Sequence, residues 1–275
     1  MYGPIIILLA NLFFTGSFSL AKWLSLGTSV WVIMLFRFLA GPVYLGPYCA
    51  IKKTSIKIHD WPLLWFRAIC GVGAMSSLFF AYKYGDIAKS TLLFETSILW
   101  TVIFEALVLK KPLHRYSILA LPLAFIGLVL VLDVTSFGGL QKSDAFALIG
   151  SIFNAGVFLS LKKLRVNHHA LPLVFWTYSL SVFLVIVPAA PQLFYVNTNH
   201  IMILIIMCSV GVIGQSLMTL GFKFSSASVS SLFMMSIVPF TAISGALFFN
   251  ERLTLINIIG MTIVIISLSI VARYR

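Results

Sequence analysis

The chain has 275 residues, of which 60% are hydrophobic and only 9% are charged, and its mean hydropathy is +1.06. A soluble domain carries about 25% charged residues, so this composition excludes a soluble globular protein and indicates a membrane protein. The net charge of +12 does not indicate a nucleic-acid partner, because the basic residues lie between apolar runs rather than on one face with stacking aromatics.

Ten apolar runs follow one another along the chain, each long enough to cross a bilayer as a helix, which takes about 20 residues. The first run follows MYGP, which has no basic residue, and no small-residue cleavage site ends it, so we expect a membrane helix rather than a signal peptide. The runs do not alternate polar with apolar residues, as the strands of a membrane barrel do. We predict an all-α membrane protein with ten transmembrane helices, at 3–22, 29–51, 61–82, 89–109, 115–133, 144–161, 170–188, 201–222, 228–249 and 255–272.

The second half of the chain repeats the first at an offset of 140 residues without a gap. Such internal similarity is informative because a repeated unit determines the architecture. We predict two five-helix repeats, at residues 1–135 and 141–275. Identical residues at matching positions include Lys22 and Lys162, Gly71 and Gly211, Lys83 and Lys223, Ser90 and Ser230, and Thr101 and Thr241.

The basic residues indicate that the two repeats have opposite orientations. Because five helices are an odd number, the second repeat enters the membrane from the other side, and the positive-inside bias must change between matching connectors. Residues 50–61 hold three lysines, whereas the matching residues 190–201 hold neither lysine nor arginine. We therefore predict inverted repeats with both termini in the cytoplasm. Twelve of the 19 Lys and Arg residues then lie on the cytoplasmic side: Lys52, Lys53, Lys57, Lys110, Lys111, Arg115, Lys162, Lys163, Arg165, Lys223, Arg273 and Arg275.

Inverted repeats related by an axis in the membrane plane are typical of secondary transporters. If each half can adopt two shapes, exchanging the shapes opens a central site first to one side of the membrane and then to the other. The substrate site then lies near the middle of the bilayer, between the halves. Some channels also have inverted repeats, so this feature favours a transporter without excluding a channel.

Three segments carry a family resemblance: FRFLAG at 36–41, RAICGVGAMSSLFFAYKYGDIAKSTLLF at 67–94 and SIVPFTAISGALFFNERL at 236–253. They resemble the second helix, the third and fourth helices, and the ninth helix with its following turn in the EamA-type transporters of the drug/metabolite transporter superfamily. The resemblance covers the whole chain and implies export or uptake of small metabolites, including amino acids, S-adenosylmethionine and toxic organic compounds. The chain departs from the family at Glu95, where an uncharged residue is usual, so substrate assignments do not carry over directly.

Arg37 and Glu95 are ionisable residues inside predicted helices, where a charge costs about 2.5–3.5 kcal/mol on insertion scales. Each lies about 10–12 Å from the outer end of its predicted helix, so the two side chains are at the same depth in the membrane and could meet. One interpretation is a charged pair in the substrate path that binds the carboxylate and the ammonium of a zwitterion. Another is a structural ion pair that neutralises two buried charges, and a third is that Glu95 accepts a coupling proton.

Further polar and aromatic residues fall within the predicted helices. Their amides and indole suit a substrate cavity, but amides also bond between helices and aromatics also form the interfacial belt. The candidate substrate-binding residues are, together with Arg37 and Glu95, Asn11, Asn154, Trp100, Phe14, Phe158 and Gln215.

Three other residues receive structural interpretations. Arg67 lies near the cytoplasmic end of the run 61–82, and we expect its long side chain to reach the lipid headgroups. Tyr82, at the other end of this run, is typical of the interfacial aromatic belt. Glu105 comes about one turn before Lys110 and Lys111, and we expect it to pair with them at the interface.

An intramembrane enzyme would need paired catalytic residues at membrane depth, but all histidines and aspartates fall in connectors or at helix ends. The three cysteines are isolated and lack metal-ligand spacing, so neither a metal nor a cofactor is expected. The sequence therefore predicts that the chain is not an enzyme.

We predict a secondary transporter that moves a small organic metabolite by alternating access. A site with one arginine and one glutamate favours an amino-acid-like or other zwitterionic solute, a class that includes S-adenosylmethionine. The alternatives are an exporter of lipophilic cations or drugs, which Glu95 and aromatic walls would bind, and a channel-like or non-transporting membrane protein. The expected partners are the small-molecule substrate and membrane lipid, with coupling to a proton or a counter-substrate left open. We expect a multi-pass protein of the bacterial cytoplasmic (inner) membrane.

Overall fold

The computed structural model describes residues 2–52, 57–109, 141–196, 198–224 and 226–251, with shorter pieces at 122–123, 125–127, 129–130, 254–256, 258–260, 262–263 and 266–267. All regular elements within these residues are helical, and the described part of the chain contains no strand. The helices are α1 (Tyr2–Ser25), α2 (Val30–Ala40), the π-helix η1 (Gly41–Leu45), α3 (Gly46–Ile51), α4 (Trp61–Tyr84), α5 (Ile87–Glu95), α6 (Ser97–Leu109), α8 (Lys142–Asn167), α9 (Ala170–Ala189), the 3-10 helix η3 (Ala190–Tyr195), α10 (Thr198–Gly221), α11 (Ala227–Met234) and α12 (Ile237–Phe249).

Eight of the predicted membrane spans are confirmed as helices that are long and apolar enough to cross a bilayer. They are Tyr2–Ser25, Val30–Ile51, Trp61–Tyr84, Ile87–Glu105, Lys142–Asn167, Ala170–Tyr195, Thr198–Gly221 and Val229–Phe249. The predicted spans 115–133 and 255–272 lie largely outside the described residues, so the total of ten helices and the position of the termini stay predictions.

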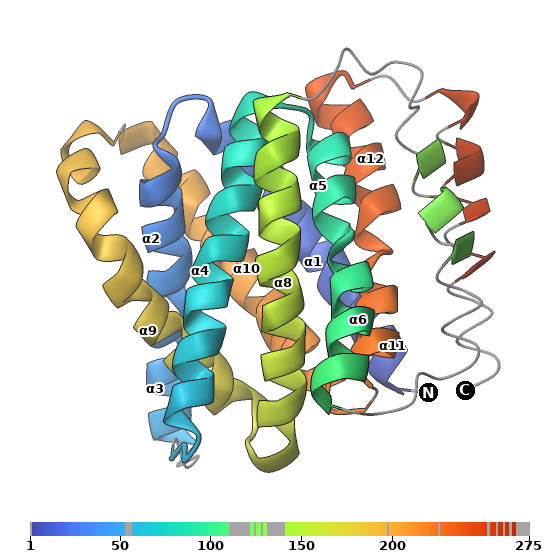
Figure 1. The fold of residues 1–275 in the computed structure, drawn as a ribbon. Coiled ribbons are helices and arrows are strands. Elements are labelled where there is room, and N and C mark those ends of the chain that lie inside the picture. The colour runs from blue at the N-terminus through green and yellow to red at the C-terminus, as the bar shows by residue number, and fades with distance from the viewer. Residues whose placement is uncertain are drawn as a thin grey trace.

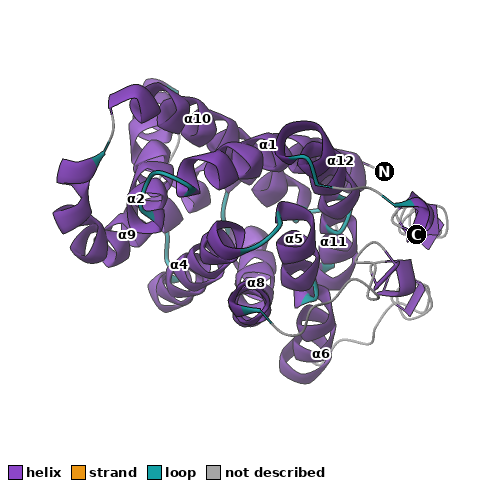
Figure 2. Ribbon diagram, turned by 90° about the horizontal axis from the view of Figure 1, so that it is seen from above, coloured by secondary structure: helices purple, strands orange, loops and turns teal. Residues whose placement is uncertain are grey.

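The helices of the two halves of the chain pack against one another rather than forming separate bundles. Helix α1 packs along α10, and α4 packs along α8. Both ribbon views show these helices side by side (Figures 1 and 2). These two pairs match at the 140-residue offset, because α1 corresponds to α8 and α4 to α10. A single apolar core cluster therefore includes residues of both halves, from Ile7 in α1 to Ala242 in α12.

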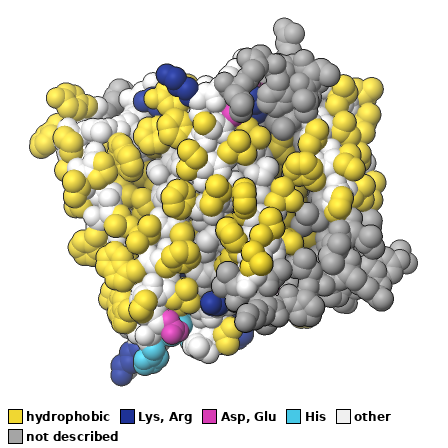
Figure 3. Space-filling model, viewed as in Figure 1, with side chains coloured by type: hydrophobic (Ala, Val, Ile, Leu, Met, Phe, Trp, Pro, Cys, Tyr) yellow, Lys and Arg dark blue, Asp and Glu magenta, His cyan; other side chains and the backbone are white. Residues whose placement is uncertain are grey.

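The outer surface is apolar across the middle of the face seen in Figure 3, with charged side chains at the two ends. Large apolar residues lie exposed on the outside of several helices, such as Leu107, Phe183 and Phe248, which are 69%, 69% and 74% exposed. In water this arrangement would be unfavourable, whereas lipid solvates it. The surface is that of a multi-pass integral membrane protein.

Two of the membrane spans are interrupted near their middle, at matching positions. Helix α5 ends at Glu95 and α6 begins at Ser97, while α11 ends at Met234 and α12 begins at Ile237. At both breaks the backbone bonds to the third residue back, as in the bond of 2.9 Å from Leu99 N to Thr96 O. Interrupted spans free backbone groups inside a membrane, which is tolerated only where protein or a cavity supplies partners.

The breaks are stabilised locally by matching hydroxyl groups. Thr96 Oγ1 donates to Leu93 O over 2.7 Å, and Ser236 Oγ donates to Phe233 O over 2.9 Å. Each hydroxyl is a second donor to a carbonyl group that also accepts a bond from the backbone N–H three residues further along the chain. In the second break Pro239 adds a cause, because it has no N–H for the carbonyl of Met235, four residues back.

Two lysines that match at the repeat offset, Lys22 of α1 and Lys162 of α8, each bond to the carboxyl end of another helix. Lys22 Nζ donates to Tyr82 O over 2.8 Å and also to Gly85 O, at the carboxyl end of α4. Lys162 Nζ donates to Phe222 O over 3.2 Å, just after α10. A lysine near the last carbonyl groups of a helix is favourable because the helix dipole is negative there.

Helices α5 and α11, which correspond to each other in the two halves, each begin with backbone N–H groups that donate to a glutamate of the other half. Glu251 accepts from Ile87 N over 2.8 Å and from Ala88 N over 3.3 Å, and Glu105 accepts from Ala227 N over 3.2 Å. Positions 87 and 227 match at the repeat offset, although the two glutamates do not. The expected pairing of Glu105 with Lys110 and Lys111 involves residues outside the described part of the chain.

The carboxyl group of Glu251 makes stability depend on pH. Burial raises its pKa above the ordinary value; the N–H groups of Ile87 and Ala88 lower it, the charge of Asp86 raises it, and that of Lys22 lowers it. A carboxyl with a higher pKa in the folded state contributes stability that is complete below the unfolded pKa of about 4.3 and is lost as pH rises through the folded pKa.

We therefore expect the unfolding midpoint of the wild-type protein to fall more steeply than that of Glu251→Gln as the pH is raised from about 4.5. The variant has no proton to lose at this position, while all other carboxyl groups are the same in both proteins. Thermal unfolding of the detergent-solubilised proteins across this pH range measures the difference. Parallel curves for the two proteins would contradict this role of Glu251.

Candidate functional site

A cavity lies inside the bundle, between helices of both halves, and contains about 650 Å³ of unfilled space including its opening. Its wall is formed by α1, α2, α4, α8, α9 and α10 together with the two interrupted spans. Apolar walls with a few polar groups are typical of small-molecule sites. The polar lining residues are Arg37, Arg67, Glu95, Asn154, Thr177, Tyr178, Ser181 and Gln215, and the phenylalanines are Phe14, Phe18, Phe38, Phe94 and Phe158.

Arg37 is held in the cavity wall with part of its hydrogen-bonding capacity unused. It lies in the last turn of α2 and is 1% exposed, and its Nη1 donates to Ser17 Oγ over 2.9 Å. Its Cζ lies 5.6–5.9 Å from the ring centres of Phe14, Phe18 and Phe79, a favourable distance for cation–π attraction. Its Nε and Nη2 have no hydrogen-bond partner among the described residues.

Glu95 brings a carboxylate to the first helix break. It is the last residue of α5 and is 2% exposed, and its Oε2 has no hydrogen-bond partner in the described part of the chain. Buried polar groups are nearly always paired, so one unpaired carboxylate oxygen and two unpaired guanidinium nitrogens in one cavity are unusual.

Arg37 and Glu95 line the same cavity but do not form an ion pair within 4.0 Å. Acidic and basic side chains do contact each other elsewhere, as Lys89 does with Asp144 and His168 with Asp60, each at 3.0 Å. The structural ion pair considered from the sequence is therefore not formed in this structure. The two groups are buried and separate, and both line the same cavity.

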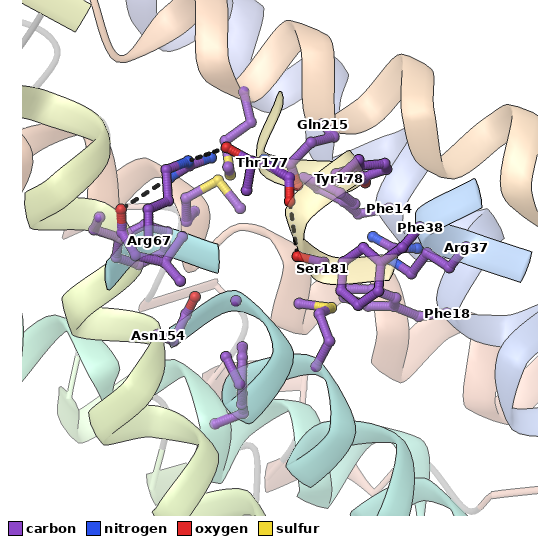
Figure 4. A pocket seen from close by; sticks show the side chains of 18 of the residues that line it. Phe14, Phe18, Arg37, Phe38, Arg67, Asn154, Thr177, Tyr178, Ser181 and Gln215 are labelled. Atoms are coloured by element: carbon purple, nitrogen blue, oxygen red, sulfur yellow. Dashed lines mark hydrogen bonds between the residues drawn. The ribbon is translucent and has the colours of Figure 1, made fainter. Parts of the chain in front are cut away.

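Arg67 is a cavity residue that the sequence interpretation missed. The expectation that it reaches the headgroups is wrong, because it is 1% exposed and its guanidinium is held inside the bundle. Its Nη1 donates to Val157 O in α8 over 3.0 Å, and its Nε donates to Thr177 Oγ1 in α9 over 3.3 Å (Figure 4). An arginine within an apolar run was the available signal, but its direction depends on how α4 packs against α8.

The two predicted asparagines bond to the two interrupted spans. Asn11 Nδ2 lies 3.0 Å from Phe233 O, 3.1 Å from Met234 O and 2.7 Å from Ser236 Oγ. Asn154 Nδ2 donates to Ser97 Oγ over 3.0 Å. Asn154 also lines the cavity, whereas Asn11 is fully buried behind its wall. Each amide thus supplies a partner at a helix break.

The remaining predicted residues divide between the cavity and other places. Phe14, Phe158 and Gln215 line the cavity. Trp100 does not, since it lies on α6 with 37% of its surface exposed and its ring 6.2 Å from that of Phe104. Tyr82 is fully buried, and its hydroxyl lies 2.8 Å from Thr91 Oγ1, so its expected place in an interfacial belt is wrong.

The described residues contain no group of three or more His, Cys, Asp or Glu side chains that could hold a metal ion. The free cysteines Cys49, Cys70 and Cys208 are buried. The described cavity offers guanidinium, carboxylate, amide, hydroxyl and aromatic groups to a bound solute.

Comparisons with known proteins agree over the whole length of the chain. The model of the EamA-like transporter family matches residues 1–133 and 141–273. The pseudopaline exporter CntI of Pseudomonas aeruginosa strain UCBPP-PA14 is 22% identical over 277 residues, which cover 99% of this chain and 96% of the relative. An uncharacterized transporter of Clostridium kluyveri is 23% identical over 296 residues, which cover 96% and 91% of the two chains. One solved crystal structure has the same fold, with a TM-score of 0.78, 12% identity and coverage of 98% of both chains.

Proposed function

Because the chain belongs to the EamA-like transporter family, we propose that this membrane transporter of small molecules carries a zwitterionic, amino-acid-like metabolite by alternating access. The transporter is a multi-pass protein of the bacterial inner membrane. The observation that carries the proposal is that a basic and an acidic side chain, Arg37 and Glu95, line one cavity with buried atoms that have no hydrogen-bond partner among the described residues: Arg37 Nε and Nη2, and Glu95 Oε2.

These groups suit the two ends of a zwitterion. A solute carboxylate can accept hydrogen bonds from Arg37 Nε and Nη2, and a solute ammonium can donate to Glu95 Oε2. Leaving a buried polar group unpaired costs about 1–3 kcal/mol, and more for a charged group, so a solute that satisfies these atoms recovers that cost on binding. Charge-assisted bonds to a carboxylate are also among the stronger hydrogen bonds in proteins.

The position of the site also supports transport. Glu95 ends the first half of one interrupted span, and Met234 and Ile237 of the other interrupted span line the same cavity. Interrupted helices that meet a central cavity are the usual place of substrate binding in secondary transporters. The proposal includes two inverted halves, residues 1–135 and 141–275, with both termini in the cytoplasm, and the matched contacts of Lys22 and Lys162 support that symmetry.

Flux into proteoliposomes tests the proposed function. We expect saturable uptake of at least one radiolabelled amino acid or related zwitterion, accelerated by unlabelled solute on the opposite side, because a carrier exchanges its solute across the membrane. The recovered solute should be chemically unchanged. The panel includes S-adenosylmethionine and quaternary cations beside neutral and acidic amino acids.

Other outcomes would contradict the proposal in different ways. Saturable flux of the quaternary cations alone would assign the site to lipophilic cations. Flux that does not saturate and shows no exchange would indicate a channel, and a modified solute would indicate an enzyme. Empty liposomes and liposomes with heat-denatured protein are the controls.

A further inference from the structure

We propose that the cavity selects an amphoteric diacid, a solute with one amino group and two carboxylate groups, and that Arg67 binds the second carboxylate. This inference rests on the proposed transport function and specifies the substrate class of the same site. Its basis is that the cavity contains two buried guanidinium groups, of Arg37 and Arg67, for one carboxylate, of Glu95.

The charges of the cavity do not balance for a neutral zwitterion. An arginine side chain keeps its proton in proteins, so Arg37 and Arg67 are both cationic. With Glu95 ionised the lining carries one excess positive charge, and a solute with one carboxylate and one ammonium does not change that excess. A solute with one additional carboxylate neutralises it, and neutralisation matters because an uncompensated charge is unfavourable where water is scarce.

The two guanidinium groups face the cavity from different sides. Arg37 comes from α2 and Arg67 from α4, and Figure 4 places them on opposite sides of the space, with Thr177, Tyr178 and Ser181 of α9 between them. A solute with a carboxylate at each end matches this arrangement better than a solute with a single one.

Both arginines retain donors for a solute. Arg67 uses its Nε and Nη1 for Thr177 Oγ1 and Val157 O, and a guanidinium has five N–H groups in all. These two bonds orient the group from two helices, which preorganises it for a planar carboxylate. Arg37 has unpaired Nε and Nη2, and the hydroxyl group of Tyr178, which lines the same cavity, is also unpaired among the described residues.

The same charges disfavour cationic solutes. S-adenosylmethionine has one carboxylate beside an ammonium and a sulfonium group, so its net charge has the sign of the cavity. Quaternary cations lack a carboxylate altogether and would leave both arginines uncompensated. Within the zwitterion class, the lining therefore favours the acidic members.

The test uses pairs of solutes that differ only in the second carboxylate. The measurement is inhibition of the uptake of a radiolabelled zwitterion into proteoliposomes. Each diacid is compared as a competitor with its own side-chain amide, and the diacids are aspartate, glutamate, 2-aminoadipate and 2-aminopimelate. For at least one chain length we expect the diacid to compete at about tenfold lower concentration than its amide, as one charge-assisted bond implies. In Arg67→Gln this preference should fall to near parity while flux of the amide persists, and Arg67→Lys should keep part of it.

Arg165→Gln is the matched control. Arg165 is also a buried arginine bonded to backbone carbonyls, those of Thr219 and His168, but it does not line the cavity. Its replacement should leave the ratio of diacid to amide unchanged.

Equal competition by diacids and amides in the wild-type protein would overturn this inference and leave the proposed zwitterion transport intact. A diacid preference that persists in both Arg67→Gln and Arg67→Lys would overturn the role of Arg67. Absence of saturable flux for every diacid and every amide would overturn this inference, and the proposed function would be overturned as well only if the other zwitterions of the panel also show no saturable flux.

Discussion

Replacing either Arg37 or Glu95 with glutamine is expected to abolish transport while the protein remains folded. Glu95→Gln keeps the shape of the side chain and Arg37→Gln shortens it, and each removes one of the two charged groups that we propose bind the solute. Losing one partner of a buried, hydrogen-bonded charge pair costs about 2–5 kcal/mol, which corresponds to a loss of roughly 30-fold or more in solute affinity. Initial rates of flux into proteoliposomes, measured over a range of solute concentrations, report this loss.

Stability should change little in these variants. Neither residue has an ion-pair partner within 4.0 Å, so the substitutions leave no opposite charge unpaired. Arg37→Gln loses the bond to Ser17 and the contact with three phenylalanine rings, which accounts for a modest decrease of the unfolding midpoint. Thermal unfolding of the same preparations separates a lost site from a lost fold.

Glu105→Gln is the control for the loss of a buried carboxylate. Glu105 is 4% exposed and lies outside the cavity lining, and a glutamine oxygen can still accept the hydrogen bond from Ala227 N. This variant should transport normally. If Arg37→Gln and Glu95→Gln also transport at the wild-type rate, the assignment of these residues to the site is wrong.

Gly211→Ala is expected to reduce transport almost as strongly as Arg37→Gln, without a matching loss of stability. Gly211 lies in α10, and a Cβ atom there would be 2.8 Å from Arg37 Nη1 and 2.9 Å from Ser17 Oγ. Contacts this short force the guanidinium out of its position. Since the end of an arginine side chain moves easily and alanine favours a helix by about 1 kcal/mol over glycine, the fold should tolerate the change.

Gly71→Ala is the matched control, because Gly71 occupies the corresponding position of the first repeat. Like Gly211 it lies in a helix, and it lines the cavity itself, but a Cβ atom there would meet nothing within 4 Å. We expect nearly normal half-saturation for this variant and about a tenfold or greater increase for Gly211→Ala. Equal half-saturation concentrations in the two variants would contradict the role of Gly211 in placing Arg37.

Much of the fold could be predicted from the sequence because lipid imposes a simple rule on it. A span must be apolar and long enough to satisfy its own backbone, so hydropathy alone located the eight spans that the structure describes. The same rule draws attention to any charge or amide inside a span. Six of the eight candidate site residues line the cavity, and four of these six are charged or amide residues: Arg37, Glu95, Asn154 and Gln215. The other two are Phe14 and Phe158.

The direction of a side chain on its helix was not available from the sequence. Asn11 and Asn154 have the same chemistry and similar depth, yet only Asn154 lines the cavity. Arg67 near a helix end was expected to reach the headgroups, but the packing of α4 against α8 and α9 places it inside. Which face of a helix is covered depends on neighbours distant in the sequence, and a single apolar run does not encode it.

The two helix breaks separate what the sequence by itself determined from what only the tertiary structure decided. At the second break Pro239 removes a backbone donor, so an interruption at Met235 follows from local chemistry alone. At the first break Leu99 occupies the corresponding position and no proline is present, yet α5 still ends at Glu95. Thr96 satisfies one carbonyl locally, but Asn154 bonds to Ser97 across 57 positions of sequence. A helix with all its N–H groups continues unless partners from elsewhere compensate the lost bonds, and only the folded bundle supplies them.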